Sequence, residues 1–351
     1  MALAPTLRQR GMMVMVRDIT MAYTQSQTPL QRLIFVHLPS ELKNKYPEGT
    51  LLHPSAFDPC LLIAKADEPF GVTGLQTDDT LNIGTLEFLK KENEALVEVG
   101  IKAKPQKILE NGMTEDFNGS RMRIHEEGYG LSTTQKGQAE KLELLDPKGS
   151  DMQMDNKDRG LNYMELDPQD LRLYIFVDGS FANNRDMSSQ IGYIVVLGNE
   201  KPTTHDNELR IDGNVIHWSS TKCKRVTRSV LASEIYGMVQ GFDIGYVVHH
   251  TINTVLGRLS FPRVPLVLCT DSYSLYQCLV QMGSTNKKRL MIDLMALRQS
   301  YENREINDIR WIQGNCNPAD AMTKASPNEA MKTLIEENGL TIKLEGWVKR
   351  E

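Results

Sequence analysis

The stretch Leu173-Tyr174-Ile175-Phe176-Val177-Asp178-Gly179-Ser180 decides the fold of the second half of the chain. Its first five residues are apolar without interruption and rich in β-forming types, which is typical of a central strand buried on both faces. An acid, a glycine and a serine follow directly. The segment therefore predicts a buried strand over 173–177 with a carboxylate at its end.

The residues around this strand predict a mixed α/β domain. Further β-rich runs lie at 191–197, 214–219, 266–269 and 309–312. Helical spacing or start signals mark 231–242, 273–282, 290–301 and the segment from Asn317-Pro318, which has the pattern of an N-cap followed by a first-turn proline. The resulting order is β-β-β-α-β-α-α-β-α. We expect a five-stranded mixed sheet flanked by helices, of the α/β (α+β) class.

The chain of 351 residues is long enough for two domains. Residues 146–170 are rich in charge, proline and glycine and poor in apolar side chains, so we predict a linker there. The linker separates a region over 1–145 from the mixed α/β domain over 171–326. Residues 327–351 are expected to form a short helix at 329–337 and a polar tail.

The composition excludes several classes of protein. The apolar runs are too short to span a bilayer or to form the core of a signal peptide, so we expect no membrane association. The five cysteines are scattered without metal-finger spacing and predict reduced thiols in an intracellular protein. The formal net charge of -5 gives no overall sign of a nucleic-acid binder.

Two local clusters of basic residues have two interpretations. Lys222, Lys224, Arg225 and Arg228 form the first, and Lys287-Lys288-Arg289 the second. Each cluster is either an ordinary solvated surface or a patch that contacts phosphates, where the release of counterions supplies affinity.

Four acids occupy distinctive places in the predicted domain: Asp178, Glu234, Asp271 and Asp320. Asp178 and Asp271 follow strands, Glu234 flanks the apolar stripe of a helix, and Asp320 lies in the first turn of the last helix. Taken singly, each is explained as a turn former, a solvated edge residue or a favourable charge near a helix start. Together they predict a convergent site. Carboxylates that crowd at one point repel one another, and a pair of Mg²⁺ or Mn²⁺ ions resolves that repulsion and supports phosphodiester hydrolysis.

The domain resembles the ribonuclease H domain of copia-type retrotransposon polyproteins, fungal members in particular. The resemblance covers about residues 171–324. It is carried by the segments 173–180, 214–220, Ala232-Ser233-Glu234, Cys269-Thr270-Asp271-Ser272 and Trp311 to Lys324.

The resemblance implies that Asp178, Glu234, Asp271 and Asp320 are catalytic ligands of two metal ions in an enzyme that cuts the RNA strand of an RNA–DNA hybrid. It also implies that Gly179 and Ser180 let the backbone approach the hybrid, whose RNA strand is recognised by its 2′-hydroxyls. The chain departs from many cellular ribonucleases H in having Gly314-Asn315 where they have a histidine, which predicts slower turnover. No small-molecule cofactor is expected.

The N-terminal region resembles an incomplete palm of the same elements' reverse transcriptase. Asp18, within the segment Arg17 to Ser26, corresponds to the first catalytic motif, and Asp78-Asp79 to the catalytic hairpin. The segment from Phe117 to Leu131 corresponds to the strands that grip the primer. The fingers, the helix that shapes the nucleotide pocket (missing between Tyr46 and His53) and much of the connection near 147–152 have no counterpart. We therefore predict a vestigial polymerase site that makes no DNA.

Two other classes of function remain open from the sequence. One is a catalytically silent remnant of a decayed polyprotein, folded like ribonuclease H, which binds hybrids without cutting them. The other is an integrase or transposase, which uses three acids on the same kind of sheet and acts on DNA.

Overall fold

The computed structural model describes residues 1–20, 52–55, 58, 60–135, 159–281, 288–324, 326 and 328–347. The chain forms two compact units. The C-terminal unit comprises Leu166–Gly257 and Phe261–Glu351 with Met1–Ala2, and the N-terminal unit comprises Leu3–Glu165 with Arg258–Ser260. Within the described ranges, no helix combines the length and apolar character needed to cross a membrane.

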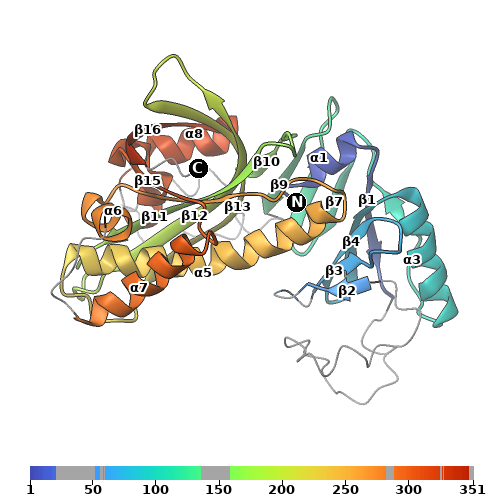
Figure 1. The fold of residues 1–351 in the computed structure, drawn as a ribbon. Helices are drawn as coiled ribbons and strands as arrows, with labels where there is room; N and C mark the ends of the chain where they lie inside the picture. Colours follow the sequence, from blue (N-terminus) through green and yellow to red (C-terminus); the bar gives the residue numbers. More distant parts are fainter. Residues whose placement is uncertain are drawn as a thin grey trace, which may run out of the picture. The chain divides into compact units, whose positions relative to one another are not determined.

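The C-terminal unit is built on six strands (Figure 1). They are β11 (Leu171–Ser180), β12 (Gln190–Pro202), β13 (Glu208–Lys222), β14 (Leu266–Thr270), β15 (Asp308–Ile312) and β16 (Gly339–Trp347). The first three pair antiparallel in sequence order, β14 lies parallel beside β11, and β15 lies parallel beside β14. Strand β16 pairs with both β13 and β15, so the sheet closes into a barrel.

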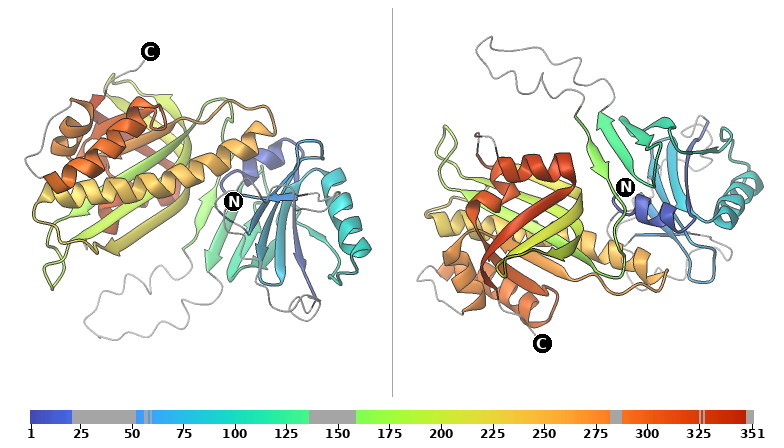
Figure 2. Two further views of the ribbon diagram at one scale, coloured as in Figure 1. Left: turned by 60° about the horizontal axis from the view of Figure 1, so that its bottom comes forward. Right: turned by 90° about the horizontal axis from the view of Figure 1, so that it is seen from above.

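Helices cover the outside of this sheet (Figures 1 and 2). They are α5 (Val230–Gly257), α6 (Tyr273–Val280), α7 (Lys288–Glu302) and α8 (Glu329–Glu337), with the short 3-10 helices η3 (Gly314–Cys316) and η4 (Pro318–Met322). The long helix α5 lies against β11 and β12. An added Cβ would strike the side chain of Val177 at Gly241 and that of Ile175 at Gly245. Small residues at these two positions therefore let α5 lie close to the central strand.

The predicted order of strands and helices up to β15 is confirmed, as is the mixed α/β class. Strands β11, β12 and β13 and helix α5 are longer than predicted. The hairpin of β12 and β13 continues into polar residues because antiparallel pairing persists from Pro202↔Leu209 onwards. The first helix was expected over 231–242 and continues to Gly257.

The end of the chain differs from the prediction. The helix at 329–337 is confirmed as α8, but the polar tail is wrong for Gly339–Trp347, which forms β16. Leu340, Ile342 and Leu344 alternate with polar residues and are buried, the two-residue period of a strand. The sheet therefore has six strands instead of five. In addition, Asn317-Pro318 starts the 3-10 helix η4 instead of an α-helix, with the Asn317 side chain accepting from the amide of Ala319.

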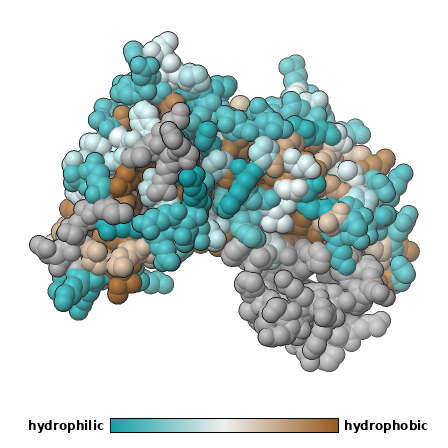
Figure 3. Space-filling view, in the orientation of Figure 1, coloured by the Kyte–Doolittle hydropathy of each residue, from teal (hydrophilic) through white to brown (hydrophobic). Residues whose placement is uncertain are grey.

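The surface of the C-terminal unit is mixed in character. Figure 3 shows hydrophobic patches among hydrophilic ones over the region of α6 and α7. Tyr273, Ile292 and Met295 are the exposed large hydrophobic side chains in the described part of these two helices.

A largely buried network of charges joins β11, β12 and β15. Arg310, whose side chain is only 7% exposed, forms ion pairs with Glu200 and with Asp308. The hydroxyl of Tyr174 donates a hydrogen bond of 2.7 Å to the same carboxylate of Glu200. Removing one member of such a network leaves a buried charge without its partner, which costs about 3–5 kcal/mol of stability.

The N-terminal unit contains two antiparallel sheets. The first has the order β2-β3-β4-β5-β1-β6 and the second the order β10-β9-β8-β7. The strands are β1 (Met13–Asp18), β2 (Leu52–Pro54), β3 (Leu61–Ala64), β4 (Gly71–Gln76), β5 (Asp79–Gly84), β6 (Lys107–Ile108), β7 (Thr114–Phe117), β8 (Ser120–Ile124), β9 (Leu131–Gln135) and β10 (Leu161–Tyr163). The helices are α1 (Ala4–Gln9) and α3 (Leu86–Glu98). Met15, Ala64, Phe88 and Leu89 form a buried cluster between the first sheet and α3.

The predicted linker contains a strand in its described part. Residues 161–163 form β10, which pairs with β9, and Tyr163 and Leu166 are buried. Apolar residues at these positions supply enough burial for regular structure despite the surrounding charges. The rest of the predicted linker up to residue 158, the segment Met21–Ser26, most of the segment between Tyr46 and His53, and Lys287 lie outside the described residues.

Candidate metal centre

Two of the predicted acids come together because their strands are parallel neighbours. Val177 of β11 lies opposite Thr270 of β14. The residues that follow, Asp178 and Asp271, therefore lie side by side at the same end of the sheet. Asp271 follows the last residue of β14 directly, as predicted. Asp178 lies within β11 instead of ending it, because pairing with β12 continues to Ser180.

Helix α5 brings the third acid, Glu234, to the same end of the sheet. Gly179 makes this approach possible, since a Cβ there would lie 2.5 Å from the carbonyl carbon of Ser233 and 2.7 Å from the amide nitrogen of Glu234. The hydroxyl of Ser233 donates a hydrogen bond of 3.0 Å to the carbonyl of Gly179. The glycine and the serine thus fix the first turns of α5 against the end of β11.

Ligand atoms of Asp178, Glu234 and Asp271 lie within 4.8 Å of one another. In the described part of the chain, this is the only group of three or more acidic, histidine or cysteine side chains that meets this distance. We call it the carboxylate cluster. Asp178 and Glu234 are buried, and Asp271 is partly buried.

The fourth acid, Asp320, lies beside the carboxylate cluster on η4. Its charge acts on both Glu234 and Asp271. One of its oxygens, Oδ2, accepts a hydrogen bond of 2.6 Å from the ammonium of Lys324. The other, Oδ1, is buried and has no hydrogen-bond partner among the described residues.

Burial and mutual repulsion raise the pKa of the site's carboxyl groups. Burial, followed by the charges of Asp178 and Asp271, raises the pKa of Glu234 to about 9. Burial and then the charges of Asp178 and Asp320 raise the pKa of Asp271 to about 6. Burial also raises the pKa of Asp320, although the hydrogen bond from Lys324 opposes this rise. Without a bound cation, the site therefore favours the protonated form of Glu234 at neutral pH.

These shifts predict that the metal-free protein loses stability as the pH rises. A carboxyl group whose pKa is higher in the folded state than in the unfolded state stabilises the fold below its unfolded pKa, and this contribution disappears as the pH rises through its folded pKa. The stabilising contribution of Asp271 is lost as the pH rises to about 6, and that of Glu234 is lost as it rises to about 9. In EDTA, thermal unfolding followed by circular dichroism should therefore show a midpoint that falls between pH 5 and pH 9.

Glu234→Gln is the matched variant for this measurement. In this variant the unfolding midpoint should change less between pH 6 and pH 9, because the glutamine side chain does not titrate. Saturating Mg²⁺ should restore the midpoint at high pH, since a metal ion binds the deprotonated carboxylates. If the unfolding midpoint of the wild type in EDTA does not depend on pH over this range, the raised pKa values of Glu234 and Asp271 are wrong.

Backbone contacts hold the carboxylate cluster in place. The Asn317 side chain is buried and donates a hydrogen bond of 3.0 Å to the carbonyl of Val177, which joins η4 to β11. The indole N–H of Trp311 donates a hydrogen bond of 3.2 Å to the carbonyl of Asp271. A Cβ on Gly314 would lie 3.2 Å from Oδ2 of Asp271, so this residue also lies close to the cluster.

Two residues beside the site had no role in the sequence-based prediction. The hydroxyl of Thr323 donates a hydrogen bond to Oδ2 of Asp178, and Lys324 pairs with Asp320. Only the second contact has a signal in the sequence, because an acid and a lysine four positions apart are neighbours on a helix. The contact of Thr323 depends on how η4 packs on β11.

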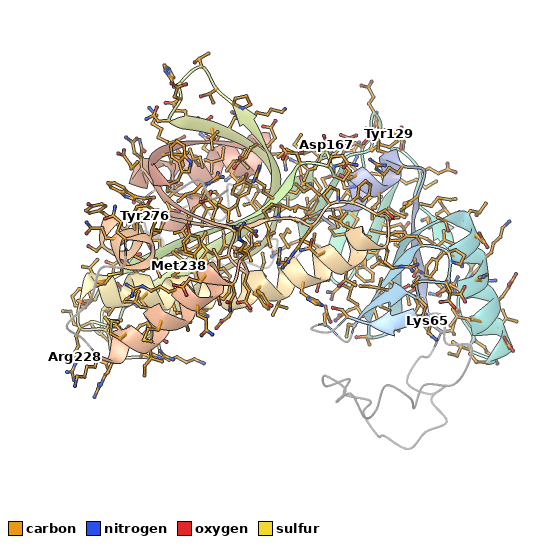
Figure 4. All side chains as sticks on the ribbon, in the orientation of Figure 1. Lys65, Tyr129, Asp167, Arg228, Met238 and Tyr276 are labelled. Carbon is orange, nitrogen blue, oxygen red and sulfur yellow. The ribbon has the colours of Figure 1, made fainter. Side chains whose placement is uncertain are left out.

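The predicted phosphate-contacting residues have mixed surroundings. Lys222 forms an ion pair with Asp186, and Arg225 forms one of 3.0 Å with Asp293. Lys224 and Arg228 are exposed, and Figure 4 shows Arg228 at the outer edge of the unit. Ser180 is partly buried at the end of β11. A contact with phosphate at Lys222 or Arg225 would therefore have to replace an existing ion pair.

The three predicted acids of the N-terminal unit lie close together, two on paired strands and one in the adjoining turn. Asp18 lies opposite Asp79 in the register of β1 and β5, and the carbonyl of Asp78 accepts a hydrogen bond from the amide of Ile19. Asp78 belongs to the turn between β4 and β5, as predicted. Lys104 forms an ion pair of 2.7 Å with Asp18. Asp18, Asp78 and Asp79 are outside the carboxylate cluster, the one described group that meets the metal-binding distance.

Comparisons with known proteins found distant structural likenesses. RNase H1 from the halophilic archaeon Halobacterium salinarum is 17% identical over 46% of this chain and 98% of its own, with a TM-score of 0.29. LC11-RNase H1, solved in complex with an RNA/DNA hybrid, is 13% identical over 46% of this chain and 99% of its own, with a TM-score of 0.30. The protease-reverse transcriptase of prototype foamy virus is 14% identical over 49% of this chain and 21% of its own, with a TM-score of 0.26.

At these identities and TM-scores, the likenesses assign no activity to this chain. No protein-family model matches the sequence. No curated protein matches it either.

Proposed function

We propose that the C-terminal unit is a metal-dependent ribonuclease H that hydrolyses the RNA strand of an RNA–DNA hybrid. The observation that carries the proposal is the carboxylate cluster, in which ligand atoms of Asp178, Glu234 and Asp271 lie within 4.8 Å of one another at one end of the sheet. Asp320 lies beside it and completes the set of four acids. Repulsion among these groups makes the arrangement costly unless cations bind there.

The donor set fits hard divalent ions such as Mg²⁺ or Mn²⁺. Carboxylate oxygens are the ligands that these ions prefer. Among the described residues, Oε2 of Glu234 and Oδ1 of Asp320 are buried and have no hydrogen-bond partner, so both oxygens are free to bind a cation. Asp178, Glu234, Asp271 and Asp320 are the proposed ligands of two ions. When bound, such ions would lower the pKa of a water molecule and stabilise charge on the leaving oxygen.

The chain's own residues supply orientation and protonation states. Thr323 fixes one oxygen of Asp178, which leaves the other oxygen of that carboxylate for a ligand. Trp311 holds the main chain at Asp271, and Gly179 sets the distance of α5 from β11. Because the pKa of Glu234 is raised to about 9, metal binding near neutral pH must release its proton. Activity should therefore rise with pH up to the point at which Glu234 is deprotonated in the presence of metal.

We infer that the N-terminal unit is the remnant of a reverse transcriptase palm, as in a retrotransposon polyprotein of the copia type. The pairing of Asp18 with Asp79 on β1 and β5 supports a palm-like arrangement of the three acids. Two features support the loss of polymerase activity. The three acids do not gather within metal-binding distance among the described residues, and Asp18 is paired with Lys104.

One experiment on the full-length chain tests both proposals. A labelled RNA template annealed to a labelled DNA primer is incubated with deoxynucleotides and with Mg²⁺, Mn²⁺ or EDTA. We expect cleavage of the RNA within the hybrid in either metal and no cleavage in EDTA. The primer should not be extended.

Each other outcome selects a different function. Binding of the hybrid in a gel-shift assay without metal-dependent cleavage would identify a silent binding remnant. Cleavage of duplex DNA would point to an integrase or transposase. Extension of the primer would show that the polymerase site is intact.

A further inference from the structure

The side chain of Lys324 lies beside the proposed metal site. Lys324 follows η4 by two residues, and its ammonium is 2.6 Å from Oδ2 of Asp320. The lysine side chain is 46% exposed, whereas that of Asp320 is only 15% exposed. The ion pair is therefore open to solvent on the lysine side and closed on the carboxylate side.

The backbone that carries Lys324 is held firmly. The carbonyl of Thr323 accepts a hydrogen bond of 3.1 Å from the Asn183 side chain, and the Thr323 hydroxyl donates to Asp178. The amide of Lys324 donates 2.9 Å to the carbonyl of Asp320. A Cβ on Gly192 would strike Met322, so η4 also lies close against β12. The partly exposed side chain of Lys324 thus extends from a backbone that is held by several contacts.

The charge of Lys324 reaches the whole site. It opposes the rise in the pKa of Glu234, of Asp271 and of Asp320. Four carboxylates around one point thus have a lysine ammonium acting on them from the side of Asp320. The ammonium binds Oδ2 of Asp320, and a divalent cation would bind the unpartnered Oδ1 of the same carboxylate, so the two positive charges oppose each other there.

We propose that Lys324 is a positioning residue that holds Asp320 towards the carboxylate cluster in the metal-free protein and competes with a divalent cation for that carboxylate. The inference rests on the proposed function, since it assigns Asp320 to a metal site. It explains how the chain keeps a cluster of acids folded before metal binds. It also implies that the affinity of the site for metal is lower than the four carboxylates alone would give.

The test is the dissociation constant of Mn²⁺, measured by titration calorimetry on the full-length protein at low ionic strength. Lys324→Met should bind Mn²⁺ about two- to five-fold more tightly than wild type, the range that the energy of a largely solvent-exposed ion pair gives. Lys324→Arg retains the positive charge and should stay close to wild type. In an Asp320→Asn background, Lys324→Met should have little further effect, because the shared carboxylate is gone.

Lys332→Met is the matched control. It removes the same charge from an exposed position on α8 and should leave the dissociation constant unchanged. An unchanged or weaker affinity in Lys324→Met would overturn the inference, and so would an equal effect in Lys332→Met. Failure of wild type itself to bind Mn²⁺ would instead overturn the proposed function. If Lys324→Met does not fold, the comparison of wild type with Lys324→Gln decides the question by the same criterion.

Discussion

Asp178→Asn is expected to lower the rate of metal-dependent hybrid cleavage by at least ~100-fold. A metal ion contributes several kcal/mol of stabilisation to the transition state, and each 1.36 kcal/mol corresponds to a factor of ten in rate. Asp178 lies in the middle of the proposed site, next to Asp271 across the strand pair and close to Glu234. Loss of its charge removes a ligand without changing the shape of the side chain.

The same substitution should have the opposite effect on stability. Removing one of several buried carboxylates relieves repulsion, so Asp178→Asn in EDTA at pH 8 should unfold at a higher temperature than wild type. Both effects are measured on one preparation, by initial rates on a labelled hybrid and by thermal unfolding. Glu302→Gln, at the exposed end of α7, is the control and should change neither quantity. Equal cleavage rates for wild type and Asp178→Asn would refute the nuclease assignment.

Gly179→Ala is expected to destabilise the C-terminal unit by about 1–3 kcal/mol, the usual cost of overpacking a well-packed contact. The added Cβ would meet backbone atoms of Ser233 and Glu234 at 2.5–2.7 Å, and backbone within a 28-residue helix does not move aside cheaply. Helix α5 would have to shift away from β11, and it carries Glu234 with it. Affinity for Mn²⁺ should fall together with stability.

Gly257→Ala is the comparison for this effect. It makes the same chemical change at the last residue of the same helix, where an added Cβ has nothing within 4 Å. Urea unfolding and Mn²⁺ titration of both variants separate a local contact from a general effect of alanine. If Gly179→Ala unfolds at the same urea concentration as Gly257→Ala, the close contact of α5 with β11 is wrong.

The strands of the C-terminal unit were predictable because their signals are local. The run Leu173–Val177 and the β-rich segments at 191–197 and 266–269 have the composition of buried strands, and the helices have regular apolar spacing. The polar extensions of β12 and β13 lack such a signal, since they depend on pairing between distant residues. Strand β16 had the alternating pattern of Leu340, Ile342 and Leu344, but its surrounding charges indicated a tail.

The site was predictable to a similar extent. Parallel pairing of the strands that precede Asp178 and Asp271 follows from the order of elements, and it brings those two acids together. The structure gives Gly179 a second role that the sequence did not indicate. The resemblance implies that it lets the backbone approach the hybrid, which stays a prediction, and the structure adds a close approach of α5 at this residue. The contact of Thr323 with Asp178 joins residues 145 positions apart, and the sequence pattern has no signal for it.

The closure of the sheet by β16 has a consequence for the synthesis of the protein. Strands β13 and β15 each have an unpaired edge until β16 lies between them, and β16 ends at Trp347. During synthesis the barrel therefore stays incomplete until β16 has emerged and paired with both strands. Until then the nascent chain exposes two strand edges that are able to pair with other chains. Chaperone capture and aggregation on the ribosome should be concentrated in that interval.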